Sequence, residues 1–320
     1  MRVAVTGAAG FIGSHLCERL VHDGHEAIGI DNFDDFYAAA VKRANLGALT
    51  RAAGFKLCEA DIRDRIAIER ALAGADAVIH LAARAGVRPS FALTSLYADV
   101  NVTGTAVILE AMSKLQVPHL IFGSSSSVYG RGAETPFREA GGLGEPASPY
   151  ASTKVAGEML CRNYSTRIER TTVLRFFTVY GPRQRPDLAI HKFARLILAE
   201  RPIPVFGSLD SFRDYTFIDD IVEGVVTALR VEEAYATFNL GSGDPITLGA
   251  MIEHLEKALG RSATRDMLPA QEGDLYGTWA DVGAARSALG YEPRWNFEEG
   301  SQRFADWMLA SSSAVGGGLT

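Results

Sequence analysis

The sequence predicts an α/β protein with a doubly wound parallel sheet, followed by a smaller C-terminal α/β lobe. Two observations support this prediction. Short apolar strands alternate with amphipathic helices up to about residue 176, and after Gly181 the alternation weakens where prolines divide the chain into short pieces. Strands that alternate with helices form parallel sheets, because each crossover helix returns the chain to the same edge. With 320 residues, the chain is long enough for about two lobes.

The first expected strand, 3–6, is followed by glycines at positions 7, 10 and 13 and by an amphipathic helix over 14–21. Gly7 allows a tight turn, Gly10 lets backbone N–H groups approach a pyrophosphate, and Gly13 lets the helix pack close to the sheet. The positive N-terminus of the helix then attracts the phosphates. The spacing is GxxGxxG rather than GxGxxG, and an ordinary strand-to-helix turn is the alternative. In this context the pattern predicts a dinucleotide site.

The second expected strand, 26–30, ends at Asp31-Asn32, about twenty residues beyond the glycine turn. A carboxylate at this position can accept hydrogen bonds from an adenosine ribose and repels a 2′-phosphate. Asp31 therefore favours NAD over NADP, with a solvated loop aspartate as the alternative interpretation.

Four more strands are expected at 55–60, 75–83, 119–122 and 171–176, with helices at 65–72, 93–114 and 151–164. Ligands of doubly wound sheets bind beyond the carboxyl ends of the strands, and polar or small residues follow several of these ends. The lobe boundary is expected near 177–181. The sequence leaves open whether the helical segment 218–229 and the strand 237–240 return to the first lobe.

A second motif, Tyr150xxxLys154, follows the helix-start signals Ser148 and Pro149. Tyr150 and Lys154 then lie one turn apart on one helix face. A lysine ammonium near a phenol, beside an oxidised nicotinamide, favours the phenolate, so that Tyr150 can act as a general base. One hydroxyl of the serine run 124–127 can bridge the reacting oxygen and Tyr150. A surface ion pair and an ordinary serine-rich turn are the alternatives.

Composition argues against several other classes. The net charge is −6 without a long basic run, which argues against nucleic acid and anionic membrane partners. No apolar run reaches the ~18 residues of a membrane span, and the chain enters a strand at once, so a cytoplasmic protein is expected. The three cysteines and seven histidines lack metal-ligand spacing, which predicts no metal site. Residues 311–320 are expected to form a disordered tail.

Taken together, these motifs resemble the extended short-chain dehydrogenase/reductases, in the nucleotide-sugar epimerase/dehydratase family, over about residues 1–309. The matching pieces are Gly7-Ala8-Ala9-Gly10-Phe11-Ile12-Gly13, Asp31-Asn32, Asp61-Ile62, His80-Leu81-Ala82-Ala83, Asn101, Ser124-Ser125-Ser126-Ser127-Val128-Tyr129-Gly130, Tyr150xxxLys154 and Arg213-Asp214. The resemblance implies a Rossmann-like NAD-binding domain over 1–177 and a nucleotide-sugar domain over 178–310.

The resemblance also implies residue roles. Asp61 and Ile62 are expected to bracket the adenine, Lys154 to hold the nicotinamide ribose, and Ser125 to supply the catalytic hydroxyl beside Tyr150. The implied cofactor contacts are Gly7, Gly10, Phe11, Ile12, Gly13, Asp31, Asn32, Asp61, Ile62, Leu81, Ala82, Ala83, Asn101, Tyr150 and Lys154.

Within that family, the stretches 81–88, 175–182, 185–187 and 271–274 most resemble members that epimerise UDP-glucuronate at C4 to UDP-galacturonate. That resemblance implies a sugar contact at Thr178, an arginine near the sugar carboxylate at Arg185, a diphosphate contact at Arg213 and a uridine ribose contact at Asp274. Further implied substrate contacts are Arg88, Ser125, Ser126 and Ser127. Two departures from the pattern are Arg84, where Gln is usual, and Arg183-Gln184, where Trp-Gly is common.

The expected reaction is reversible hydride transfer between the sugar C4 and NAD through a 4-keto sugar. UDP-glucose/UDP-galactose 4-epimerisation is the main alternative. The 4,6-dehydratases carry Asp-Glu where this chain has Ser126-Ser127, and UDP-glucuronate decarboxylases usually carry Glu at Ser127, so both are disfavoured. A non-enzymatic NAD(H)-binding regulator is the alternative of another class.

The resemblance further implies a homodimer, in which two helices of each subunit pair across the interface. The apolar residues expected to carry it are Val107, Ile108, Met112, Val155 and Met159, with a place in the core of the single chain as the alternative.

Overall fold

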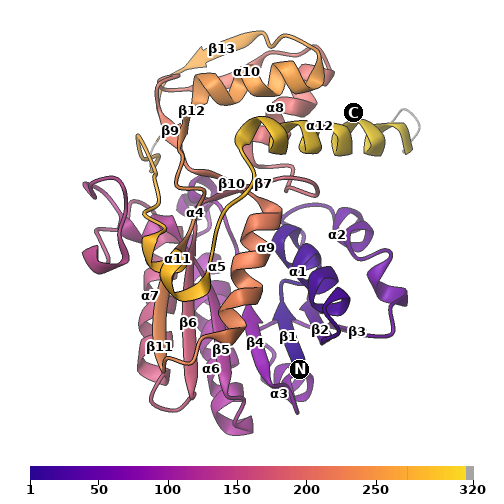
Figure 1. Ribbon diagram of the computed structural model, residues 1–320, viewed down its shortest axis with the longest axis vertical. Coiled ribbons are helices and arrows are strands. Elements are labelled where there is room, and N and C mark those ends of the chain that lie inside the picture. The colour runs from indigo at the N-terminus through magenta and orange to yellow at the C-terminus, as the bar shows by residue number, and fades with distance from the viewer. Residues whose placement is uncertain (272, 315–320) are drawn as a thin grey trace.

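A computed structural model describes residues 1–271 and 273–314 and contains a seven-stranded sheet in which every pair of neighbours is parallel (Figure 1). The strand order is β11-β6-β5-β4-β1-β2-β3. The strands are β1 (Arg2–Thr6), β2 (Glu26–Asp31), β3 (Phe55–Glu59), β4 (Ala77–His80), β5 (His119–Ser125), β6 (Arg170–Phe176) and β11 (Tyr235–Leu240). The predicted fold class is confirmed. Strands β2 and β3 are added on one side of β1, and β4, β5, β6 and β11 on the other. The switch point therefore lies between β1 and β4, where a doubly wound sheet opens a ligand crevice.

Helices cover both faces of the sheet. On one face α1 (Phe11–His22) packs against α9 (Ile218–Thr227), and on the other α3 (Arg65–Leu72) and α7 (Pro149–Tyr164) pack against α6 (Gly104–Leu115). Side chains along β1 alternate between the two faces. Val3 and Val5 pack in the core on the side of α1 and α9, and Ala4 packs in the core on the side of α3, α6 and α7. Strands buried on both faces explain the nearly continuous apolar runs in the sequence.

The helix expected over 93–114 consists of several pieces. After α4 (Val87–Ala92), α5 (Thr94–Ala98) leads through a π-helical segment (Asp99–Thr103) into α6. Val107, Ile108 and Met112 are buried in the core of the chain itself, which corrects their expected place in a dimer interface. The apolar period of a helix indicates a buried face without saying which surface covers it.

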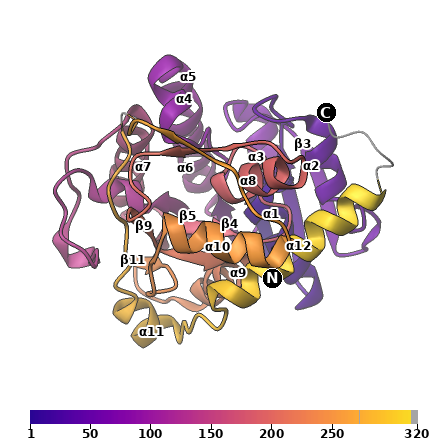
Figure 2. The same ribbon diagram turned by 90° about the horizontal axis from the view of Figure 1, so that it is seen from above.

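The second lobe lies above the sheet in Figure 1, and Figure 2 shows α8 and α10 crossing over it. Its strands form two-stranded pairs, β7 with β10, β9 with β12 and β8 with β13. The bounds are β7 (Thr178–Tyr180), α8 (Ala189–Leu198), β8 (Ile203–Phe206), β9 (Phe212–Arg213), β10 (Tyr215–Phe217), β12 (Ile246–Thr247), α10 (Leu248–Leu259), β13 (Arg265–Leu268) and α12 (Phe297–Ala314). Helix α11 (Gly283–Leu289) lies beside the sheet (Figure 1), where it packs against β11 and α9. The remaining elements are α2 (Ala39–Asn45) and short 3-10 turns at Leu49–Arg51, Ser126–Tyr129, Glu139–Gly141 and Ala228–Arg230.

The first lobe is discontinuous in sequence. Between pieces of the second lobe, the chain returns as α9, which packs on α1, and as β11, which pairs with β6 at the edge of the sheet. The disordered tail expected from residue 311 differs from the structure over 311–314, because α12 continues to Ala314. Serines cost a helix only a few tenths of a kcal/mol each, so they do not stop it. Residues 315–320 of that tail lie outside the described residues.

Within the described residues, no helix is long and apolar enough to cross a membrane, and no group of three or more His, Cys, Asp or Glu side chains could hold a metal ion.

Candidate active site

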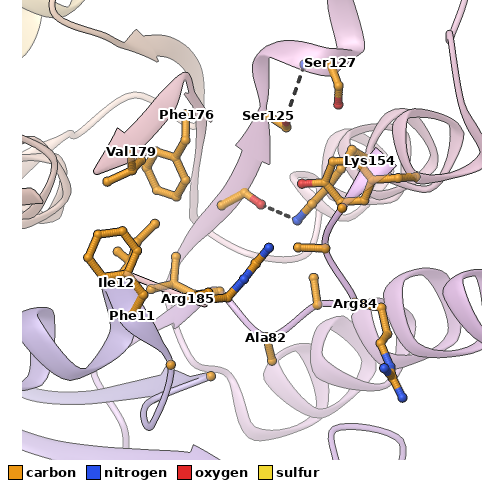
Figure 3. Close-up of a pocket in the computed structure, with 18 of the residues that line it drawn as sticks. Phe11, Ile12, Ala82, Arg84, Ser125, Ser127, Lys154, Phe176, Val179 and Arg185 are labelled. Carbon is orange, nitrogen blue, oxygen red and sulfur yellow. Dashed lines mark hydrogen bonds between the residues drawn. The ribbon is translucent and has the colours of Figure 1, made fainter. Parts of the chain in front are cut away.

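A cavity of about 500 Å³ lies at the carboxyl ends of the central strands, beneath residues of the second lobe (Figure 3). It brings together almost every site residue that the sequence singled out. Those lining it are Gly7, Gly10, Phe11, Ile12, Gly13, Asp31, Asn32, Asp61, Ile62, Leu81, Ala82, Ala83, Ser125, Ser126, Ser127, Tyr150, Lys154, Thr178, Arg185, Arg213 and Asp274. Arg88 and Asn101 do not line it.

The glycine turn brings the backbone close to the cavity. Gly7 has a φ of +72°, and a Cβ there would lie 3.0 Å from the Ala82 backbone nitrogen. A Cβ on Gly13 would lie 2.1 Å from the Gly7 carbonyl oxygen, so α1 can approach the turn only with glycine at this position. The N-terminus of α1, at Phe11, therefore faces the cavity with its orphan N–H groups.

Strand β4 covers Ala77–His80, which is shorter than the expected 75–83, and the side chain of Thr6 binds the chain directly after it. The Thr6 hydroxyl oxygen accepts hydrogen bonds from the backbone N–H groups of Leu81 and Ala82, each at 3.1 Å. These contacts hold residues 81–83 against the glycine turn, where they form one wall of the cavity.

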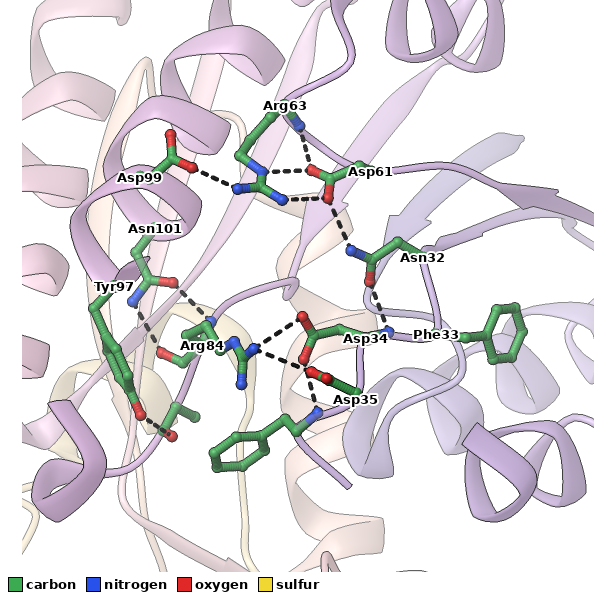
Figure 4. Close-up of polar contacts among 12 residues, drawn as sticks. Asn32, Phe33, Asp34, Asp35, Asp61, Arg63, Arg84, Tyr97, Asp99 and Asn101 are labelled. Atoms are coloured by element: carbon green, nitrogen blue, oxygen red, sulfur yellow. Dashed lines mark hydrogen bonds and ion pairs between the residues drawn. The ribbon is translucent and has the colours of Figure 1, made fainter. Parts of the chain in front are cut away.

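At the β2 end, the buried Asp31 carboxylate accepts the Ala9 and Phe33 N–H groups at 3.0 and 2.8 Å. Each of its oxygens makes one of these bonds, so each keeps a lone pair for a further donor in the cavity. Asn32 donates to Asp61 at 2.9 Å, and the Arg63 guanidinium holds the pKa of the Asp61 carboxyl at about 2 (Figure 4). The carboxylates of Asp31 and Asp61 are therefore both fixed at the β2 end of the cavity. Their negative charge favours the hydroxyl groups of a ligand there and disfavours a phosphate group.

Helix α7 begins as its sequence predicts, with the Ser148 hydroxyl accepting the Ala151 N–H at 3.2 Å and Pro149 in the first position. It presents Tyr150 and Lys154 to the cavity, opposite the end of β5. The Lys154 ammonium donates to the Gly123 carbonyl at 2.7 Å, and burial lowers the pKa of this side chain to about 8.

Burial raises the pKa of the Tyr150 phenol, while a hydrogen bond with Ser125 and the charge of Arg185 lower it. The sequence expectation assigned a cationic effect on the phenol, beside an oxidised nicotinamide, to Lys154, and that role stays a prediction. The Ser125 oxygen accepts the Ser127 N–H at 3.2 Å, which leaves the Ser125 proton free to be donated to Tyr150. Only tertiary structure brings Arg185 from the second lobe to this phenol.

Behind the cavity lies a buried ion pair that the sequence analysis missed. Glu158 accepts from Arg175 at 3.0 and 2.8 Å and from the Ser124 hydroxyl at 2.5 Å, and both charged side chains are almost wholly buried. The network joins β5, β6 and α7 directly behind Ser125 and Lys154. The position of Glu158 one turn beyond Lys154 was the available signal.

Asn101, expected to contact the cofactor, instead supports the cavity wall. Its amide oxygen accepts the Arg84 N–H at 2.7 Å, and its nitrogen donates to the Arg84 carbonyl and the Thr153 hydroxyl, each at 2.9 Å. Asn101 sits in the π-helical segment, a feature common near functional sites.

The second lobe supplies the other end of the cavity. Arg185 reaches into it (Figure 3) while its Nε and Nη2 donate to Asp187 at 3.0 and 2.9 Å. Arg213 donates to the carbonyls of Phe212, Leu275 and Tyr276.

Two expected substrate residues meet at the rim of this end. Arg88 donates to the Asp274 carboxylate at 2.8 Å and so braces a residue that lines the cavity.

Ser127 also lines the cavity, and its buried hydroxyl has no partner among the described residues. Glu272, part of the stretch 271–274, lies outside the described residues.

Comparison with known proteins agrees with this geometry. The model of the NAD dependent epimerase/dehydratase family matches residues 3–241. A probable UDP-glucuronate 4-epimerase of Rhizobium meliloti (strain 1021) is 39% identical, covering 96% of both chains. A UDP-glucuronate 4-epimerase of Thermodesulfobacterium geofontis (strain OPF15) is 40% identical, covering 95% of this chain and 94% of the relative. The crystal structure of UDP-glucuronic acid 4-epimerase from Bacillus cereus with UDP-glucuronic acid and NAD superimposes with a TM-score of 0.90 at 36% identity, covering 97% of this chain and all of the other.

Proposed function

The chain belongs to the NAD dependent epimerase/dehydratase family, and on that premise we propose that it inverts C4 of a UDP-sugar, interconverting UDP-glucuronate and UDP-galacturonate with bound NAD. The observation that carries the proposal is the joint placement of Ser125, Tyr150 and Lys154 in one cavity with the cationic Arg185. Relatives named as UDP-glucuronate 4-epimerases support the choice of sugar.

NAD fits the first lobe. The N-terminus of α1 offers N–H groups to its pyrophosphate, Asp31 offers lone pairs to its adenosine ribose, and Asp61 and Ile62 flank the adenine. When bound, NAD supplies a hydride acceptor and, after reduction, a hydride donor. The first lobe, residues 1–177 with the returning segments near 214–240, holds this cofactor, and the lobe of 178–310 holds the nucleotide sugar.

Tyr150 and Ser125 handle the proton. The Tyr150 phenolate takes the proton of the sugar 4-hydroxyl, directly or through Ser125, as the C4 hydrogen leaves as hydride and a 4-keto sugar forms. The sugar then turns about its diphosphate, which Arg213 holds, while Asp274 holds the uridine ribose. Hydride returns to the opposite face of C4, and Tyr150 returns the proton, so no net oxidation occurs.

A 4-keto derivative of UDP-glucuronate is a β-keto acid, which loses CO₂ when the breaking bond aligns with the carbonyl. An epimerase must therefore hold the carboxylate out of that alignment. Arg185 offers charge-assisted donors, and the hydroxyls of Thr178, Ser126 and Ser127, which line the same cavity, add neutral ones. The buried Ser127 hydroxyl, which has no hydrogen-bond partner within residues 1–271 and 273–314, supports this role.

We also propose a homodimer in the cytoplasm. The outward face of α7 carries Met159, which is 46% exposed. Phe91 of α4 and Leu93, which directly follows α4, are 39% and 43% exposed. A second copy of the chain would cover this apolar surface. A monomer mass by light scattering at micromolar concentration would exclude the dimer.

The cytoplasmic location is supported by the three cysteines, which are all free and suit a reducing compartment.

The central test incubates the purified protein with UDP-glucuronate and, separately, UDP-glucose, with products resolved by NMR. UDP-galacturonate from the first substrate is the expected result. Preference for UDP-glucose would favour the alternative epimerase, and bound nucleotide without turnover would favour a regulator. Denaturation of the protein should release NAD(H), and recovery of NADP instead would contradict the role given to Asp31.

A further inference from the structure

A cluster at the rim of the cavity, separate from Tyr150 and Lys154, joins two loops of the first lobe (Figure 4). Arg84 lies in the loop that follows β4. Its guanidinium pairs with Asp34 at 3.2 Å and with Asp35 at 3.4 Å, and the guanidinium carbon lies 5.4 Å from the centre of the Phe36 ring. We call Arg84, Asp34, Asp35 and Phe36 the clasp. Asp34, Phe36 and Arg84 all line the cavity, so the clasp closes part of its rim.

Both sides of the clasp are anchored. The backbone of Arg84 is held on both its N–H and its C=O by Asn101, which in turn bonds Thr153 of α7. On the other side, Lys42 donates to the Asp34 carbonyl at 2.8 Å, and the Asn32 side chain accepts the Asp34 N–H at 3.1 Å. The ion pairs therefore join two segments that are each hydrogen-bonded to the surrounding structure.

Phe36 also touches the second lobe. The Arg185 guanidinium carbon lies 5.3 Å from the centre of its ring, close to the distance of Arg84 from the same ring. Cation–aromatic contacts of this kind are attractive. The 34–36 segment is thus held by one arginine from each lobe, above the part of the cavity that lies next to Asp31 and Asn32.

We propose that Arg84 is a positioning residue for the cofactor, which clasps the 34–36 segment over the cavity and slows the release of NAD. The inference rests on the proposed NAD-dependent function and adds a role for a residue that departs from the resembled pattern. Glutamine, usual at this position, cannot form an ion pair or a charged stack. The Arg84 side chain is only 12% exposed and that of Asp34 28%, whereas Asp35 is 98% exposed, so Asp34 supplies most of the electrostatic attraction.

The test compares Arg84→Gln with Arg43→Gln as a matched control. Arg43 lies in α2, shortly after the 34–36 segment. It also combines an ion pair, with Glu59, and a stack, on Phe33 at 4.0 Å, but it does not line the cavity. Protein loaded with labelled NAD is chased with excess unlabelled NAD, and the release rate is measured by rapid filtration. We expect Arg84→Gln to release NAD about three- to tenfold faster than the parent, and Arg43→Gln to match the parent.

Two carboxylate variants sharpen the comparison. Asp34→Asn keeps the Oδ1 that accepts the Phe36 N–H at 2.9 Å but removes the Oδ2 that pairs with Arg84, so it should match Arg84→Gln. Asp35→Asn should release NAD at nearly the parent rate. Equal release from the parent, Arg84→Gln and Asp34→Asn would overturn the clasp, and so would equal acceleration by Arg43→Gln.

Hydrogen exchange on nucleotide-free protein supplies a readout that needs neither NAD nor turnover. Amides of the 34–36 segment should exchange faster in Arg84→Gln than in the parent or Arg43→Gln, and unchanged exchange would refute the anchoring. If the parent binds no NAD, the proposed function fails, and cofactor retention fails with it. If the parent binds NAD and Arg84→Gln releases it at the parent rate, only the clasp fails.

Discussion

Replacing Arg185 with alanine should impair UDP-glucuronate turnover far more than any turnover of UDP-glucose. The Arg185 side chain is 19% exposed and uses Nε and Nη2 on Asp187, which leaves Nη1 and the second Nη2 hydrogen as donors for a substrate. A charge-assisted hydrogen bond of this kind contributes roughly 1.5–3 kcal/mol, or about ten- to a hundredfold in kcat/KM. Only the substrate with a carboxylate should lose this term.

The substitution has three other effects, and all of them act equally on the two substrates. Loss of the Arg185 stack on the Phe36 ring loosens the 34–36 segment whichever sugar is bound. The charge of Arg185 lowers the pKa of the Tyr150 phenol, so its removal weakens the general base for either sugar. Asp187 loses its partner, but it is 38% exposed and can be hydrated. The ratio of the two kcat/KM values therefore isolates the carboxylate term.

The assay is steady-state kinetics on both substrates, with Arg183→Ala as the control. Arg183 lies two residues earlier but pairs with Glu18 at 2.6 Å and does not line the cavity. Arg185→Ala should also release a 4-keto-pentose product and accumulate bound NADH, because an unheld β-keto acid loses CO₂ before hydride returns. An equal loss on both substrates, or a parent enzyme that prefers UDP-glucose, would refute the assignment.

Further predictions concern the proton relay, the buried network and pH. Tyr150→Phe keeps the ring that packs edge-on against Tyr97, so NAD content should persist while kcat falls ~10²–10⁴-fold, and near-parent turnover would remove Tyr150 from the mechanism. Glu158→Gln leaves Arg175 buried and unpaired and should cost roughly 3–5 kcal/mol in urea unfolding, whereas adding Arg175→Met should restore most of it; equal stability of the single and double variants would contradict this. Acidification should destabilise the fold, because burial lowers the pKa values of four histidines and the unfolded chain takes up their protons first. The pKa is about 4 for His15, about 3 for His80 and about 4 for His119, and that of His191 is also lowered. Their contribution is full above about pH 6.5 and is lost as pH falls toward about 3, so a thermal midpoint that stays constant between about pH 7 and about pH 5 would count against it.

Local patterns in the sequence were enough for the sheet, the glycine turn and the helix that carries Tyr150 and Lys154. Each of these features depends on residues that are close together in the sequence, so the sequence alone predicts it. The signals are the alternation of strands and helices, the Gly7–Gly13 spacing and the helix start at Ser148-Pro149. Asp31 could be located for the same reason, because its place at the end of a strand follows from the strand itself.

The contacts that tune the site join residues far apart in the chain, and only the tertiary structure decided them. Arg84 meets Asp34 across 50 positions and Arg185 acts on Tyr150 across 35, and no local period specifies either partner. Periodicity likewise marked Val107 as buried without saying whether its own chain or a second copy covers it. A residue pattern determines which face of an element turns inward, whereas the packing of all the elements together determines what that face meets.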